Sequence, residues 1–186
     1  GFRVLIDPFQ GVPGLPDTAA RANAVYCSHG HFDHNHTQNV TLTEGGEDPF
    51  TVTEVPYFHD GQGGTLRGPN TIRRFAAEGL SVVHLGDLGC QLTAEQVRAL
   101  RPCDALLVPV GGFYTIDAQG AKAVAEALSP RVIVPMHYRT EAFGLREIDT
   151  VEPFLALFSK ELVRRYGANR LELTADTPAQ VAVLSV

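Results

Sequence analysis

The chain has 186 residues and a mass of 20.1 kDa, which suits one domain, or two closely packed halves, over residues 1–186. With 44% apolar and 19% charged residues it can bury a core, which excludes a disordered or fibrous protein. The formal net charge of −6 and the lack of a Lys/Arg-rich run argue against a nucleic-acid binder, and no apolar run approaches the ~20 residues of a membrane span.

The cysteines and the start of the sequence give indications of the cellular compartment of the protein. Three cysteines without CxxC spacing predict free thiols in a reducing, cytoplasmic environment. The sequence begins at Gly1 without a leader pattern, and Met136 is its only methionine, so we expect a processed or truncated chain. A removed secretory leader would weaken the cytoplasmic prediction.

The first half of the chain predicts short strands separated by loops. Runs of β-branched and apolar residues predict strands over residues 2–6, 24–28, 51–59 (with a bend at Pro56), 71–76 and 81–85. Stretches rich in glycine and proline predict loops at 11–17 and 61–69.

The second half alternates between strand and helix patterns. A capping box of Thr93 and Gln96 begins a helix that ends before Pro102, and Asp117 is the N-cap candidate of a second helix reaching Leu128. The other elements predicted here are buried strands over 104–110 and 131–135, an amphipathic helix over 151–166, and short strands near Leu171 and Val181. This order indicates a layered α/β protein with helices covering sheets.

A cluster of histidines follows the strand at 24–28. Four of the seven histidines lie within eight positions, in His29-Gly30-His31-Phe32-Asp33-His34-Asn35-His36. Alternate residues of an extended loop point the same way, so His29 and His31 can bind one ion, and Asp33 and His34 can face a second one. Imidazole and carboxylate groups are common ligands of divalent metals. A solvated polar loop is the alternative, whereas a purification tag would be contiguous and terminal.

Three further candidates stand at or near the ends of predicted strands. His59 ends one strand, Asp87 follows another, and His137 follows a third. Alone, each would be read as a hydrogen-bonded buried histidine or a turn aspartate. Together with the cluster they favour a shared metal site, because strand ends can converge from distant parts of the sequence.

The order of these motifs resembles that of the metallo-β-lactamase superfamily. The resemblance rests on Asp7, His29-x-His31-x-Asp33-His34, His59, Gly86-Asp87 and Met136-His137-Tyr138. The flanking residues are similar to those of one branch of this superfamily, the zinc-dependent hydrolases related to ascorbate-6-phosphate lactonase. The similar segments are His59-Asp60, Gly63-Gly64, Arg67-Gly68-Pro69-Asn70-Thr71, His84-Leu85-Gly86-Asp87-Leu88-Gly89, Pro109-Val110-Gly111-Gly112 and Val134-Pro135-Met136-His137-Tyr138.

The resemblance implies a four-layer αβ/βα sandwich with two metals at one edge. It implies that one metal is held by His29, His31 and His59, the other by Asp33, His34 and His137, and that Asp87 bridges them. Asp7 would orient a ligand from behind the site. His84 would be a supporting residue, and the resemblance gives His36 no role.

The sequence departs from the superfamily pattern in two places. A strand pair that usually precedes residues 5–7 is absent, so either the sequence omits it or a sheet edge needs a partner to pair with. Cys90 stands where relatives often carry histidine, and it is either a packing residue, which we favour, or an adventitious ligand.

The implied site predicts a binuclear metal-dependent hydrolase. Two divalent cations sharing a water would generate hydroxide at neutral pH, with Asp33 able to relay a proton. Zinc is expected, and manganese or iron suits the same ligands. Arg67, Asn70, Gly112 and Tyr114 are the candidate substrate contacts, although Arg67 could equally be a surface charge.

We expect a small-molecule ester, lactone or phosphoester substrate, with no nucleic-acid or membrane partner. The alternatives are a phosphodiesterase or nuclease of the same superfamily, and a metal-binding protein without turnover. A homo-oligomer is compatible with the sequence, which does not specify the oligomeric state or the natural substrate.

Overall fold

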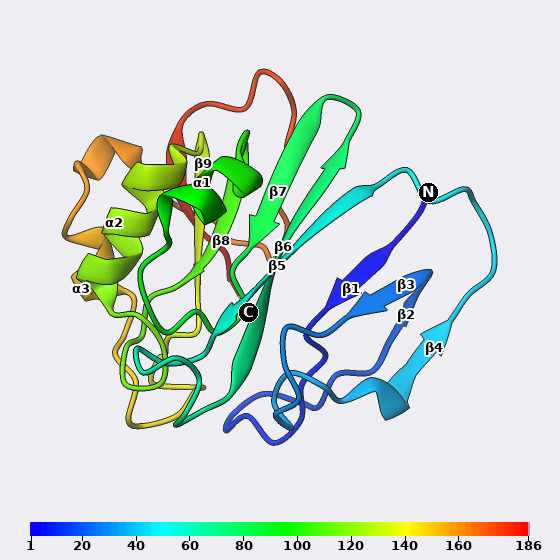
Figure 1. Cartoon of the computed structure of the whole chain (residues 1–186), viewed down its shortest axis with the longest axis horizontal. Coiled ribbons are helices and arrows are strands. Elements are labelled where there is room, and N and C mark those ends of the chain that lie inside the picture. Colours follow the sequence, from blue (N-terminus) through cyan, green and yellow to red (C-terminus); the bar gives the residue numbers. More distant parts are fainter. Residues whose placement is uncertain (186) are drawn as a thin grey trace.

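A seven-stranded sheet forms the centre of the computed structural model, which describes residues 1–185 (Figure 1). Its strand order is β10-β11-β9-β8-β7-β6-β5. These strands are β5 (Thr51–Phe58), β6 (Pro69–Ala77), β7 (Leu80–His84), β8 (Ala105–Pro109), β9 (Val132–Met136), β10 (Val163–Arg165) and β11 (Gln180–Val183). Only β6 runs against its neighbours, so the C-terminal ends of the other strands meet at one edge.

Helices cover one face of this sheet (Figure 1). They are α1 (Ala94–Leu100), α2 (Ala118–Leu128) and α3 (Glu152–Leu155). The capping box of Thr93 and Gln96 is present, and the Asp117 side chain accepts a hydrogen bond from the Gly120 amide. Between sheet and helices lies the main core, with fully buried leucine, valine and phenylalanine side chains that include Leu85, Leu106, Val124, Leu128 and Phe154. Burial of this surface fixes the strands whose ends carry the candidate site.

The opposite face is occupied by short strands of the N-terminal part (Figure 1). β1 (Val4–Ile6) pairs in parallel with β3 (Ala24–Tyr26), and β2 (Ala20–Ala22) pairs in parallel with β4 (Val40–Leu42) after the 3₁₀ turn η1 (Thr37–Asn39). The sequence pattern did not predict β2 and β4. Within residues 1–185 each of these strand pairs has unpaired edges. The three α-helices all lie on the other face of the seven-stranded sheet, so three of the four expected layers are present: the helices, the large sheet and the short strand pairs.

The end of the chain departs most from the sequence-based prediction. The helix predicted over 151–166 is wrong, because only α3 is helical and the chain then passes through the 3₁₀ turn η2 (Lys160–Leu162) into β10. The apolar residues that suggested one helix belong to two different elements: Phe154 and Leu155 are buried in α3, and Val163 of β10 pairs with Val181 in the sheet. The strand expected near Leu171 is not formed, whereas the one near Val181 is β11. No helix among the residues described is long and apolar enough to cross a bilayer.

Candidate metal centre

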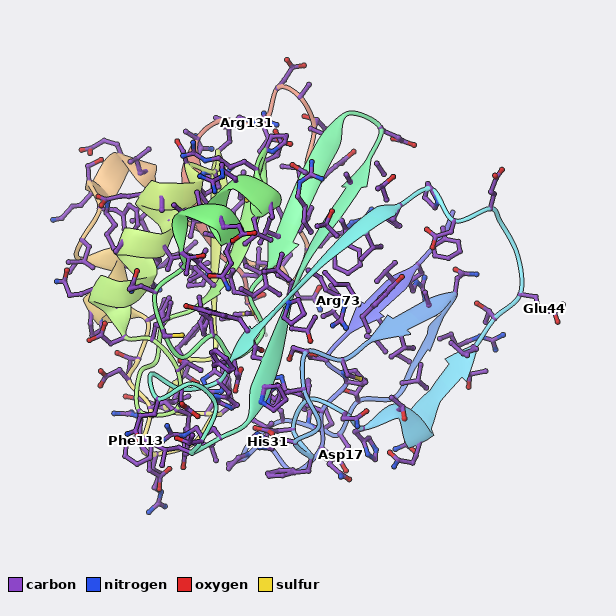
Figure 2. The ribbon with its side chains drawn as sticks, viewed as in Figure 1. Asp17, His31, Glu44, Arg73, Phe113 and Arg131 are labelled. Carbon is purple, nitrogen blue, oxygen red and sulfur yellow. The ribbon has the colours of Figure 1, made fainter. Side chains whose placement is uncertain are left out.

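Four strand ends deliver the predicted ligands to one edge of the molecule. The loop 27–36 follows β3, His59 follows β5, Asp87 lies just beyond β7, and His137 follows β9. Figure 2 shows His31 at this edge. Ligands separated by more than 100 residues in the sequence therefore become neighbours, as the histidine pattern predicted.

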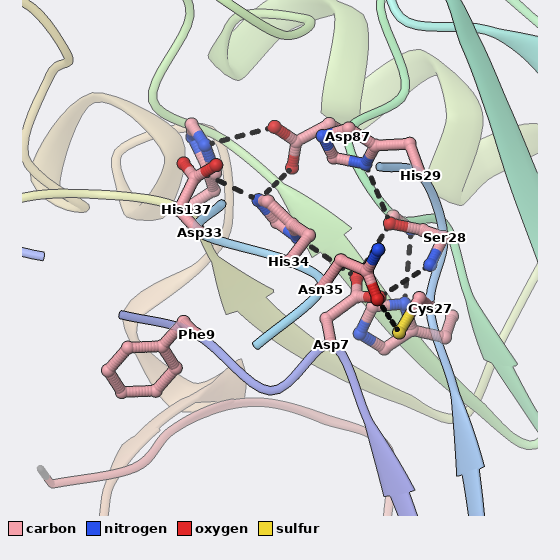
Figure 3. A network of polar contacts seen from close by, with 12 residues as sticks. Asp7, Phe9, Cys27, Ser28, His29, Asp33, His34, Asn35, Asp87 and His137 are labelled. Carbon is pink, nitrogen blue, oxygen red and sulfur yellow. Dashed lines mark hydrogen bonds and ion pairs between the residues drawn. The ribbon is translucent and has the colours of Figure 1, made fainter. Parts of the chain in front are cut away.

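Asp87 is 3% exposed, and its carboxylate contacts His34 and His137 (Figure 3). Its Oδ1 is 3.3 Å from Nε2 of His34, and its Oδ2 is 3.2 Å from Nε2 of His59 and 3.3 Å from Nε2 of His137. One carboxylate thus reaches histidines from both of the ligand sets that the resemblance implies. This geometry is compatible with a bridging ligand.

All seven predicted ligands fall into compact groups of potential metal ligands. Within each group one ligand atom per residue lies within 4.8 Å of the others. The groups are His29, His31 and His59; His34, Asp87 and His137; and His29, Asp33 and His34. The first group contains the residues of the predicted first set, and the second contains His34 and His137 of the other set together with Asp87. Asp33, predicted in that other set, is grouped with His29 and His34 instead.

Buried polar atoms in the cluster provide a test of whether metals fit. Nε2 of His29 and Oδ1 of Asp87 are buried and have no hydrogen-bond partner within the described structure. Leaving such atoms unpaired costs about 1–3 kcal/mol each, so they are rare in folded proteins. Divalent cations would satisfy these nitrogen and oxygen atoms, and the residues present therefore fit bound metal.

Asp7 holds the histidine loop from behind (Figure 3). Its carboxylate accepts hydrogen bonds from the Ser28 amide at 2.6 Å and the Ser28 hydroxyl at 2.7 Å, and Nδ1 of His34 lies 3.1 Å away. A proton on Nδ1 of His34 would satisfy this contact and leave the Nε2 lone pair free toward the site. Asp7 has φ +49° and His137 has φ +55°, in the left-handed region that residues other than glycine adopt uncommonly.

The electrostatics of the cluster follow from burial and mutual contact. Burial, reinforced by the charge of His34, lowers the pKa of His29 to about 3, which keeps it in the neutral form that binds metal. Burial would lower the pKa of His34 as well, but the carboxylates of Asp7 and Asp87, which lie beside its two ring nitrogens, outweigh it and raise that pKa to about 10. A metal ion on Nε2 would take the place of the proton there. Burial would raise the pKa of Asp87, but the surrounding imidazoles hold it well below its ordinary value.

Asn70 proves to be a scaffold residue, which corrects its prediction as a substrate contact. It is fully buried, its side-chain amide donates to the Leu85 carbonyl at 2.9 Å, and its Oδ1 accepts from the Asp87 amide at 2.9 Å. Both polar ends are thus used to fix the turn before Asp87. Gly86, with φ +55°, has no room for a Cβ, which would lie 2.3 Å from Oδ1 of Asn70.

The other three predicted substrate contacts also lie outside the cavity beside the cluster. The Arg67 guanidinium lies 5.5 Å from the Tyr114 ring centroid and donates to the Phe113 carbonyl at 3.2 Å. Gly112 is buried next to them. Arg67 is neither a free surface charge nor a cavity residue, because it ties the loop at 61–68 to the turn at 111–115.

A cavity of about 310 Å³ adjoins the cluster, and apolar side chains dominate its walls. It touches Asp33, His34, Asp87 and His137 but none of His29, His31 and His59. Its other walls come mainly from two loops and include Phe9, Val12, Leu15, Phe143, Leu145 and Ile148. The sequence analysis missed these residues, because isolated apolar positions in loops form no motif.

The remaining histidines and Cys90 lie outside the ligand groups. Nδ1 of His84 accepts a hydrogen bond from the Gly86 amide at 3.1 Å, so this nitrogen is not available to a metal. That contact agrees with a supporting role. Both ring nitrogens of His36 are buried without a partner in the described part of the chain, and half-buried Cys90 joins none of the groups.

Comparison with known proteins identifies the family. Residues 1–137 match the model of the β-lactamase superfamily domain, and the chain belongs to this superfamily. A Thermotoga maritima protein assigned to its zinc-dependent hydrolases is 33% identical and superposes with a TM-score of 0.74, over 97% of this chain and 88% of that one.

Curated relatives place the chain within the superfamily. A UPF0173 protein of Pyrococcus furiosus is 30% identical over 89% of this chain and 84% of its own length. A UPF0173 metal-dependent hydrolase of Archaeoglobus fulgidus is 29% identical over 80% of each. The chain therefore groups with the UPF0173 family, and the fold predicted from the motif order is confirmed at the level of a metallo-β-lactamase-like α/β fold.

Proposed function

We propose that this protein is a metal-dependent hydrolase with a pair of divalent cations, zinc in the first instance. The observation that carries the proposal is the Asp87 carboxylate, whose two oxygens lie 3.2–3.3 Å from Nε2 of His34, His59 and His137. The names of the relatives as metal-dependent hydrolases support it. So does the assignment of the Thermotoga protein to zinc-dependent hydrolases.

The predicted metal ligands divide into two sets, one for each cation. His29, His31 and His59 would hold one cation, Asp33, His34 and His137 the other, and Asp87 would contact both. When bound, such a pair lowers the pKa of a shared water toward ~7 and acts as a Lewis acid. The chain's own contribution is to orient the imidazoles through Asp7 and Ser28, to keep Asp87 ionised and to provide Asp33 as a proton acceptor at its carboxylate.

The proposed substrate is a small ester or lactone, with phosphoesters as a further class to test. Lactones are included because the sequence motifs resemble those of the ascorbate-6-phosphate lactonase branch. A nuclease is disfavoured by the net charge of −6, since a polyanion would be repelled.

Metal content and turnover test the proposal together. His34→Ala is expected to lower the number of bound cations and to abolish hydrolysis of a chromogenic ester, lactone and phosphodiester panel, while the circular dichroism spectrum stays unchanged. His36→Ala, two residues further along the same loop, is the matched control and should keep the wild-type metal content. Full metal occupancy of the wild type without turnover on any panel would favour a metal-binding protein without catalysis instead.

A further inference from the structure

The apolar cavity beside the second ligand set offers information on the substrate that the metal ligands do not. Its volume of about 310 Å³ lies at the lower end of the range for small-molecule sites. Its polar side chains are those of the metal cluster, Asp33, His34, Asp87 and His137, together with Asp7, His84 and Tyr138. The rest of its wall is made by aliphatic and aromatic side chains.

Two loops form this wall, and contacts between them fix its position. The Gly144 amide donates to the Pro13 carbonyl at 2.9 Å, which joins the loop after β9 to the loop after β1. The approach is so close that a Cβ on Gly14 would lie 1.9 Å from the Ala142 carbonyl oxygen. The apolar side chains of both loops, Leu15 and Leu145 among them, are thereby kept in one surface.

The charge of the lining is equally informative. Among the described residues that line the cavity there is no Lys or Arg, and its carboxylates are Asp7, Asp33 and Asp87. Arg67, the cation expected to bind a phosphate or carboxylate, is held by Phe113 and Tyr114 outside the cavity. An anionic group placed deep in the cavity would therefore lose hydration without gaining a Lys or Arg partner.

We propose that the cavity binds an uncharged apolar acyl group, so that the substrates are neutral esters of medium-chain or aryl carboxylic acids. This inference rests on the proposed hydrolytic function and narrows its substrate class. The carbonyl carbon lies at the metal ligands and the acyl chain extends between the two loops. Sugar phosphates and phosphodiesters then fit this cavity poorly.

Chain length provides a quantitative test. For the zinc-loaded protein, kcat/KM for 4-nitrophenyl esters should rise by about fourfold per methylene from acetate to hexanoate, because each buried methylene is worth about 0.8 kcal/mol. The ester of adipate, which has the same six carbons and a terminal carboxylate, should react at least about tenfold more slowly than the hexanoate.

Variants of the wall supply the controls. Leu145→Asp should remove the dependence of kcat/KM on chain length, and Leu15→Asp repeats the test on the opposite loop should the first variant fold poorly. Leu42→Asp, at a position 66% exposed on β4, should keep the full dependence.

A binding experiment separates this inference from the proposed function. Calorimetric titration of the zinc-loaded protein should show hexanoate binding more tightly than acetate, with the difference lost in Leu145→Asp. That result without any ester turnover would leave the cavity assignment standing and refute the hydrolase proposal for esters. Ester turnover that is flat from acetate to hexanoate and unchanged in Leu145→Asp would overturn the cavity assignment and leave the hydrolase proposal standing.

Discussion

Replacement of Asp7 by Asn tests how the histidine loop is oriented. Asn is nearly isosteric and tolerates the φ of +49° at this position, so the change removes the charge with little effect on the backbone. The Asp7 side chain accepts two hydrogen bonds from Ser28 and contacts Nδ1 of His34 at 3.1 Å. An amide group facing Nδ1 would favour the His34 tautomer that carries its proton on Nε2, where a metal would bind.

The expected loss in metal affinity is about 10- to 100-fold, the usual effect of removing a partner of a metal-binding histidine, or about 1.4–2.7 kcal/mol. Competition with a graded series of chelators, read by elemental analysis, measures it. Asp17→Asn is the control, because this exposed carboxylate accepts a hydrogen bond from the Gly11 amide without touching the cluster. Wild-type metal affinity in Asp7→Asn would refute the orienting role.

Three further changes test the scaffold, two of them beside the site and one at the opposite end of the sheet, where Asp104 pairs with Arg131 (Figure 2). Asn70→Ala should lower the free energy of unfolding by about 2–4 kcal/mol in urea denaturation, because it leaves two buried backbone groups unpaired; a loss below 1 kcal/mol would count against the scaffold role. Gly89→Ala should reduce metal content, since its Cβ would lie 2.3 Å from the backbone next to His59, whereas Gly30→Ala inside the histidine motif meets nothing within 4 Å and should be neutral in the same elemental analysis. Burial would raise the pKa of Asp104, but the hydrogen bonds from Arg131 and Ser81 outweigh it and lower that pKa, so the stability contributed by its ionised form is present above its ordinary value of 3.8 and lost as pH falls below it. Urea midpoints at pH 6 and pH 3 should therefore differ less in Asp104→Asn than in wild type, and an equal difference would contradict this interpretation.

The metal cluster could be predicted because its chemistry demands particular residue types. Four histidines in one short loop, with His59, Asp87 and His137 at or near strand ends, form a pattern that few other functions require. The structure brings these side chains together through the parallel arrangement of β5, β7 and β9. The sequence therefore contained the identity of the cluster, although not its distances.

The substrate side of the site could not be predicted in the same way. The cavity walls come from apolar residues such as Leu15 and Leu145, which meet only because two loops join through Gly144 and Pro13. Arg67 is predicted to contact substrate because a guanidinium binds carboxylates and phosphates, and Asn70 because it follows in the same loop. Their hydrogen-bonding groups are instead used within the fold.

Short or irregular elements were the other source of error. β2 has the sequence Ala-Arg-Ala, without β-branched residues, and is extended only because it pairs with β4. The spacing of Val151, Phe154, Leu155 and Phe158 is helical, yet only one turn of helix forms before the chain enters β10. Tertiary pairing overrides local propensity in both segments.

The number and position of bound cations test the account most directly. Crystals of the zinc-loaded protein, measured on both sides of the zinc absorption edge, should show two anomalous peaks per chain, one among His29, His31 and His59 and one among Asp33, His34 and His137. Both peaks should lie within ligand distance of Asp87. A single peak, or a pair in which Asp87 contacts neither cation, would contradict the binuclear centre on which the proposed hydrolysis depends.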